Sequence, residues 1–156
     1  MFDTWDNADR VYAGLTEVDA LKKHDGGSSF AGTLLHITAL MDFHINARVR
    51  SKEMHPLFAR QYQQFWQTGQ ADDWPGILAA VKEVRASLRA YLEPLTDADL
   101  ERIKFPPTYQ WPEATLRYIL YRGVTHNYFH IGEVAAKRDK LGHKVGEYPG
   151  PLADAM

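Results

Sequence analysis

The chain has no cysteine among its 156 residues, which excludes disulfide bonds, thiolate metal ligands and a cysteine nucleophile. Any metal ion would therefore be held by nitrogen or oxygen atoms. The length is typical of one compact domain, and a chain of this size buries well over half of the surface that it exposes when unfolded. We predict a single domain over residues 1–156.

Long apolar runs and a surplus of one charge are also absent. No segment approaches the ~18 apolar residues of a membrane span, and 18 Lys and Arg residues stand against 20 Asp and Glu residues. These charges are spread along the chain, so they form no basic stripe for nucleic acid and no polybasic membrane anchor. The N-terminal segment MFDTWDNADR is acidic and polar, unlike a secretory signal. We expect a cytoplasmic protein that binds neither nucleic acid nor membranes.

Helical spacing of apolar residues dominates the sequence, and no strand-like alternation is long enough to build a sheet. The predicted helices span residues 4–21, residues 30–54, a shorter piece from Pro56 towards Gly69, residues 74–93, and Pro112 to about Leu141. The connection LTDADLERIKFPPTYQ contains a short helical turn at most. Four helices with opposed apolar stripes predict an all-α four-helix bundle, followed by an irregular tail over about residues 142–156.

Two histidines lie one helical turn apart in VTHNYFHIGEV, residues 124–134. His126 and His130 fall on the stripe of the last predicted helix that carries its apolar residues. At about 100° per residue, His36 falls on the apolar stripe of the second predicted helix, and His44 lies on its flank. The remaining histidines lie in or beside loops. Three histidines are therefore expected to face the interior of one bundle.

A single histidine on a buried face is usually a core residue whose nitrogens find partners. Three converging histidines would bury up to six ring nitrogens, and each nitrogen left unpaired costs about 1–3 kcal/mol. A divalent cation lowers this cost because it binds one nitrogen of each ring, so that only the second nitrogens need other partners. Three neutral imidazoles also leave coordination positions open for water or substrate, as in catalytic sites. We therefore favour a metal site formed by His36, His126 and His130 over a histidine-containing core.

Two known metal motifs do not fit. A zincin helix needs HExxH, but the chain has Asn127 after His126. A di-iron bundle needs two Glu-x-x-His motifs, and no histidine here has a glutamate three residues before it. Glu133, three residues after His130, is a candidate catalytic base. It is equally a candidate fourth ligand, an acceptor for a ligand's second nitrogen, or a solvated carboxylate.

The segments SFAGTLLHITALMDFH and VTHNYFHIGEVAAKRDKLG, with their separation in a chain of this size, resemble the DinB/YfiT-like family of metalloenzymes. The resemblance extends over essentially the full length. It implies a four-helix bundle of up-down-down-up topology, with a metal triad that matches His36, His126 and His130. Family members often read His-x-x-x-His-x-Gly-Gln, whereas this chain has Glu133 in place of the glutamine.

The resemblance also implies a range of functions. Characterised relatives include transferases and an isomerase that use mycothiol, bacillithiol or glutathione. We therefore expect bound Zn²⁺ or Ni²⁺, a small-molecule substrate, a low-molecular-weight thiol as cofactor and a homodimer. A thiol-dependent S-transferase is favoured by the resemblance alone. The alternatives are a metal-dependent hydrolase, a non-catalytic metal-binding or stress-response protein, and a metal-free bundle that acts through its aromatic surfaces.

The walls of the expected pocket are predicted to come from three parts of the chain. The first predicted helix would contribute Trp5 and Tyr12, and the second His44. The long connection before the last helix would contribute Tyr109 and Trp111.

Overall fold

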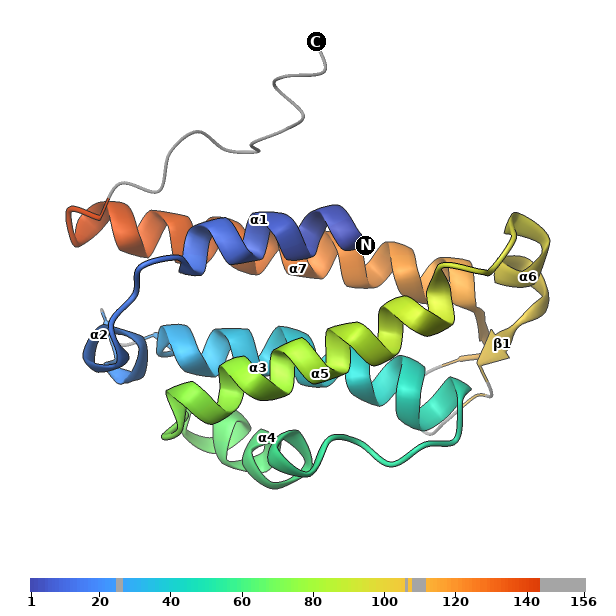
Figure 1. Cartoon of the computed structure of the whole chain (residues 1–156), viewed down its shortest axis with the longest axis horizontal. Helices are drawn as coiled ribbons and strands as arrows, with labels where there is room; N and C mark the ends of the chain where they lie inside the picture. Colours follow the sequence, from blue (N-terminus) through green and yellow to red (C-terminus); the bar gives the residue numbers. More distant parts are fainter. Residues whose placement is uncertain (25–26, 106, 108–111, 144–156) are drawn as a thin grey trace, which may run out of the picture.

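The computed structural model describes residues 1–24, 27–105, 107 and 112–143. The described residues form a four-helix bundle with short helices in its connections (Figure 1). The bundle helices are α1 (Phe2–Tyr12), α3 (Phe30–Met41) extended by the π-helix η1 (Asp42–Val49), α5 (Trp74–Leu92) and α7 (Leu116–Lys140). The connections carry α2 (Glu17–Leu21), α4 (Pro56–Thr68) and α6 (Asp97–Arg102). The predicted all-α fold is confirmed.

The bundle has up-down-down-up topology. Helices α1 and α7 run in one direction and α3 and α5 in the other (Figure 1). Because α3 and α5 are parallel, the chain must cross back over the length of the bundle between them, and α4 lies in this crossover. Before α7, two short strands, β1 (Lys104–Phe105) and β2 (Ala114–Thr115), pair in antiparallel register.

The first predicted helix is divided in two. α1 ends at Tyr12, and Gly14 adopts a left-handed φ of 71°, which ends the helix at little steric cost. Thr16 then begins α2, because its side chain accepts a hydrogen bond from the backbone N–H of Asp19. The apolar spacing continues through this turn, so it could not reveal the break.

The second predicted helix changes its hydrogen bonding partway. From Asp42 the helix is of the π type, and it ends before Ser51, whose φ is 54°. The buried Asp42 carboxylate accepts hydrogen bonds from Asn46 Nδ2 at 2.8 Å and from the backbone N–H of His55 at 2.7 Å. The wider π turn advances each residue through a smaller angle than an α turn. His44 is consequently buried on the side predicted for Phe43, whose side chain is 38% exposed.

The last predicted helix begins three to four residues later than expected. Thr115 is its N-cap, accepting a hydrogen bond from the backbone N–H of Tyr118, while Pro112 precedes strand β2. Along α7, Gly123 lies against α3: a Cβ at this position would lie 2.5 Å from Met41 Sδ. The absence of a side chain at Gly123 therefore lets the two helices approach closely.

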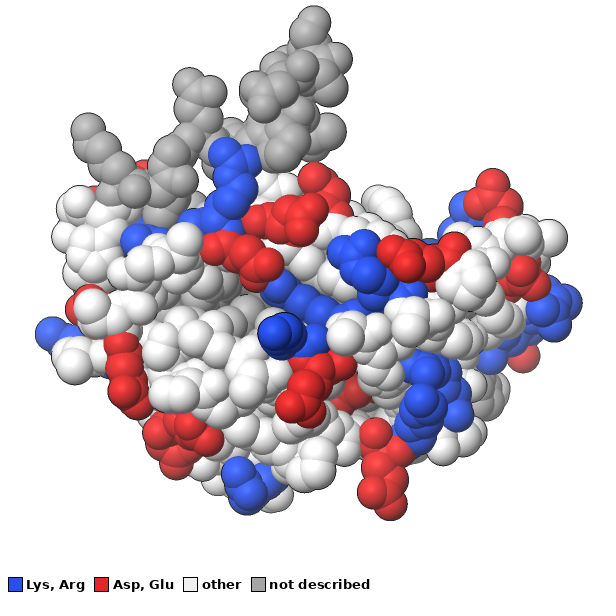
Figure 2. Space-filling model, in the orientation of Figure 1, with Lys and Arg blue, Asp and Glu red and all other residues white. Residues whose placement is uncertain are grey.

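The surface over α1 and α5 carries charges of both signs. Figure 2 shows basic and acidic side chains intermixed on this face. Among the described residues, no helix combines the length and apolar character needed to cross a membrane.

A buried arginine connects α1 and α7, the first and last helices of the bundle. Arg138 of α7 donates from Nη1 to the carbonyl oxygens of Val11 at 2.8 Å and Ala13 at 2.7 Å. These carbonyls lie at the end of α1, where the helix itself provides no donors. We predict that Arg138→Met lowers the free energy of unfolding by about 2–4 kcal/mol, because two charge-assisted hydrogen bonds are lost and the buried carbonyl of Val11 loses this donor.

Urea denaturation followed by circular dichroism measures this change. The matched control is Arg10→Met, which removes an exposed arginine from α1 and should change the stability by less than about 0.5 kcal/mol. Equal effects of the two substitutions would contradict the role assigned to Arg138.

Candidate metal centre

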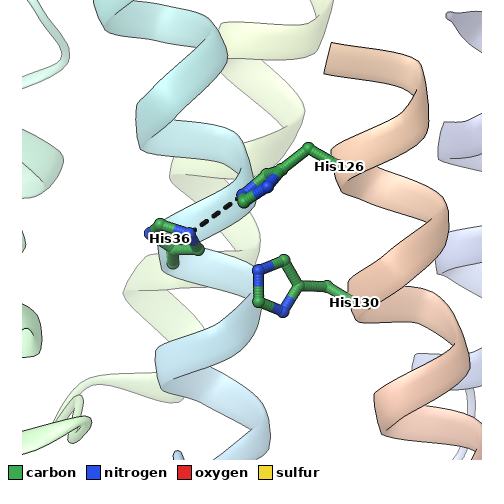
Figure 3. Close-up of side chains that lie close together, drawn as sticks. All are labelled: His36, His126 and His130. Atoms are coloured by element: carbon green, nitrogen blue, oxygen red, sulfur yellow. Dashed lines mark hydrogen bonds between the residues drawn. The ribbon is translucent and has the colours of Figure 1, made fainter. Parts of the chain in front are cut away.

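Three histidines from two helices converge at one point (Figure 3). His36 comes from α3, while His126 and His130 come from successive turns of α7. One nitrogen from each ring can be chosen so that all lie within 4.8 Å of one another, and the Nε2 atoms of His36 and His126 are 3.0 Å apart. Two nitrogens that bind one cation at about 2.0–2.1 Å lie roughly 3 Å apart. The donor set therefore fits a single divalent cation.

The cluster lies at the border of the core. His36 is 5% exposed, whereas His126 and His130 are only partly buried. The residues that directly follow them on α7, Asn127 and Ile131, occupy the buried positions that the predicted stripe gave to the histidines. The two α7 rings thus stay partly exposed, which leaves one side of the cluster accessible.

Helix α4 holds His36 through a wall of aromatic rings. The backbone N–H of Ser29, which caps α3, donates to the carbonyl oxygen of Gly69 at 3.0 Å, and this bond fixes the end of α4 beside the start of α3. Phe65 then stacks on the His36 ring with centroids 5.0 Å apart, and the Trp66 ring meets the His36 ring edge-on at 5.2 Å. The orientation of His36 is set by packing.

Glu133 holds His130 and is itself held by a lysine. Its Oε2 accepts from His130 Nδ1 at 2.9 Å, and its Oε1 accepts from Lys137 Nζ at 2.5 Å. Lys137 also donates to the backbone carbonyl of Ser28 at 3.1 Å. With its proton on Nδ1, His130 keeps the Nε2 lone pair for a metal ion. Of the roles considered for Glu133, this geometry favours the acceptor of a ligand's second nitrogen.

The surroundings keep two of the three histidines, His36 and His126, neutral. Burial, together with His130 and His126, lowers the pKa of His36 to about 3. Burial, His130 and Arg122 lower the pKa of His126 to about 4. Burial would raise the pKa of Glu133, but hydrogen bonds from Lys137 and His130 outweigh it and the pKa is lowered. At neutral pH the site therefore presents the uncharged imidazoles of His36 and His126 beside an ionised carboxylate.

An apolar cavity of about 220 Å³ opens beside the cluster. Its lining consists of His36, Leu40, Met41, His44, Trp66, Tyr118, Ile119, Arg122, Gly123 and His126. A second cavity of about 210 Å³ shares His44, Tyr118 and Ile119 with it and extends towards the strand pair. Burial, Arg48 and His126 lower the pKa of His44 to about 4. The structure thus places His44 in the pocket wall.

The structure places the other expected wall residues elsewhere. Trp5 and Tyr12 line a larger groove of about 680 Å³ between α1 and α5, which does not include the three histidines. This corrects their expected place, and the reason is the face of α7 on which α1 packs: Asn127 of α7 donates to Thr4 of α1. Tyr109 and Trp111 lie outside the described residues.

Sequence reasoning missed two features of the site: the aromatic wall from α4, and the positively charged Arg122 in the cavity lining. Tyr62, Phe65 and Trp66 occur in the segment QYQQFWQ, where their spacing of three and four residues places them on one helix face. That spacing was a usable signal, although it did not indicate which helix the face would meet. Arg122, one turn before His126, is the only charged residue in the described lining of the 220 Å³ cavity if the histidines are neutral.

Comparison with known proteins identifies relatives of this architecture. The family model described as the DinB superfamily matches residues 3–134. Among solved structures, the chain is similar to YfiT from Bacillus subtilis, described as a probable metal-dependent hydrolase with an unusual four-helix bundle topology. The identity is 20%, the TM-score is 0.64, and the match covers 90% of this chain and 82% of YfiT. At this identity the likeness shows the fold. No curated protein matches the chain.

The lowered histidine pKa values predict an acid-sensitive protein when no metal is bound. Folded His36 and His44 have pKa values of about 3 and 4, against 6.5 for an unperturbed histidine. Below pH 6.5 the unfolded chain binds protons that the folded chain does not, so stability is complete above pH 6.5 and falls towards pH 4. Each such histidine contributes about 1.4 kcal/mol per pH unit in this window.

Urea unfolding in EDTA at pH 7.0, 6.0 and 5.0 checks this dependence. His36→Leu should weaken it, because one of the buried titrating groups is removed. His143→Leu, at the end of α7 and away from the cluster, should leave it unchanged. A free energy of unfolding that is equal at pH 7.0 and 5.0 would exclude the predicted shifts.

Proposed function

The chain belongs to the DinB superfamily, and from this premise we propose that it is a divalent-metal-dependent enzyme with His36, His126 and His130 as ligands. The convergence of one nitrogen from each ring within 4.8 Å carries the proposal. When bound, a divalent cation supplies Lewis acidity, which lowers the pKa of a thiol or water molecule at its open positions. Zn²⁺ and Ni²⁺ suit imidazole ligands and are the proposed metals.

The chain's own residues prepare this chemistry. Neutral His36 and His126 offer lone pairs at neutral pH, because protonation of either ring requires acidic conditions. Glu133 orients His130 without adding an anionic ligand. A cation held by neutral imidazoles keeps its full charge, which increases its effect on a bound nucleophile.

We favour a low-molecular-weight thiol as the nucleophile. The described lining of the cavity contains no aspartate or glutamate, and both Glu133 oxygens are already engaged by His130 and Lys137. A carboxylate base for water is therefore absent from the described lining. A thiol, with an ordinary pKa of about 8.5, ionises far more readily than water and needs no such base. These features support a thiol-dependent S-transferase.

Hydrolysis is the second candidate. It is supported by the likeness in fold to YfiT, which is described as a probable metal-dependent hydrolase. His44, in the cavity wall, is the residue placed to accept a proton from water, although its pKa of about 4 makes it a weak base. A cytoplasmic location and a homodimer stay predictions.

Metal analysis tests the site directly. Protein purified without added metal, histidine tag or chelator should contain about one equivalent of Zn²⁺ or Ni²⁺. His126→Ala should lose the metal and the increase in melting temperature that added Zn²⁺ gives, because one of three ligands is removed. Glu133→Gln should bind Zn²⁺ about 10–100-fold more weakly, since the hydrogen bond that orients His130 is weakened.

The control for this experiment is His143→Ala, which should retain both metal and stabilisation. Wild-type protein with well under one equivalent of metal, together with an equal melting temperature of His126→Ala and wild type at all Zn²⁺ concentrations, would overturn the proposed site.

A substrate screen separates an enzyme from a non-catalytic metal-binding protein. We expect metal-loaded protein to accelerate the reaction of mycothiol, bacillithiol or glutathione with 1-chloro-2,4-dinitrobenzene, and His36→Ala to lose at least about a hundredfold of the rate, because the cation is lost. Hydrolysis of a nitrophenyl ester without thiol would favour the second candidate. Turnover that survives in His36→Ala would exclude the proposed mechanism, and no turnover with any thiol or ester would favour the non-catalytic role.

A further inference from the structure

The size of the cavity beside the histidines restricts what can enter it. The cavity has a volume of about 220 Å³. This is room for one small ring system. Apart from the histidines, most of the described lining is apolar, with Leu40, Met41 and Ile119 among its members. The cavity therefore favours a compact apolar group.

Trp66 offers this group a flat surface. The residue is 64% exposed, yet its ring is held edge-on to His36 at 5.2 Å and to Tyr62 at 5.9 Å. Phe65 makes a third contact with it, at 5.9 Å. An aromatic ring that is fixed on one side and exposed on the other can stack with a ligand without losing much side-chain entropy.

The charges around the cavity disfavour a cationic ligand. Arg122 lies in the described lining, and no carboxylate lies there to balance it. The proposed metal ion would add further positive charge. Burial of an ammonium group at this position would thus lack a counter-ion and would cost desolvation energy.

From these three observations we propose that the cavity is the binding site for a planar, uncharged, apolar group of the substrate, which stacks on Trp66 beside the three histidines. In the transfer reaction this group would carry the electrophilic atom. The inference rests on the proposed function, because it assigns a substrate class to that same site. Binding of the apolar group itself, however, requires no metal.

A matched pair of probes tests the proposal in metal-free protein. 1-Naphthalenemethanol has the proposed character, and 1-naphthylmethylammonium has the same shape with a positive charge. Titrations followed by ¹H–¹⁵N NMR should show shifts of backbone signals around Leu40, Ile119 and Gly123. We expect the neutral probe to bind at least tenfold more tightly than the charged one.

Variants assign the binding to this cavity. Trp66→Ala should weaken binding of the neutral probe at least fivefold, and Trp66→Phe should restore most of the affinity because a flat ring is retained. Trp66 is largely exposed, so neither change threatens the fold. Ala86→Trp narrows the separate groove between α1 and α5 and should leave the affinity unchanged.

Equal affinity for the two probes, no effect of Trp66→Ala, or loss of binding in Ala86→Trp would each overturn the inference. These outcomes are independent of metal content and turnover. Probe binding by a protein that takes up neither Zn²⁺ nor Ni²⁺ in the metal analysis would leave this inference standing and refute the proposed function. A metal-loaded, active enzyme whose cavity fails the probe test would refute this inference and leave the proposed function standing.

Discussion

The close approach of α3 and α7 at Gly123 is the constraint on which the site depends. Any side chain there would collide with Met41 Sδ, 2.5 Å from the position of a Cβ. His126 lies one turn further along α7, and its Nε2 reaches within 3.0 Å of His36 Nε2. A larger separation between the helices would leave the rings of one helix unable to meet the ring of the other. The packing of the Met41 side chain against Gly123 therefore helps to bring the three histidines into one ligand set.

Partial burial determines the chemical state of that set. Fully buried rings would hold a cation away from substrate, and fully exposed rings would be protonated in mild acid. At the border of the core, burial lowers the pKa of His36 to about 3 and of His126 to about 4, while one side of the cluster opens into the cavity. The aromatic wall of α4 adds to this effect because it excludes water from one face of His36. The rings are neutral and still accessible to a ligand.

Much of the fold and the convergence of the histidines were predictable, because helical period and the i, i+4 spacing of His126 and His130 are local properties of the sequence. The π-helix was not predicted from the local spacing, and Asp42 at its start accepts a hydrogen bond from the backbone of His55, 13 residues away. That single change exchanged the positions of Phe43 and His44. The aromatic wall was missed for the same reason: the contact between Ser29 and Gly69 that docks α4 joins distant residues. Sequence spacing defines a face of a helix, and tertiary contacts decide what that face meets.

Glu133 stands where similar sequences often have glutamine, and its surroundings show why the charge is tolerated. An isolated carboxylate beside the site would offset part of the positive charge of a metal ion and weaken its Lewis acidity. Lys137 prevents this, because its ammonium group binds the other carboxylate oxygen at 2.5 Å and is itself held by the carbonyl of Ser28. The pair Glu133–Lys137 is neutral as a unit. The carboxylate can thus accept the Nδ1 proton of His130 as a charged partner, which an amide would not be, while Lys137 balances its charge.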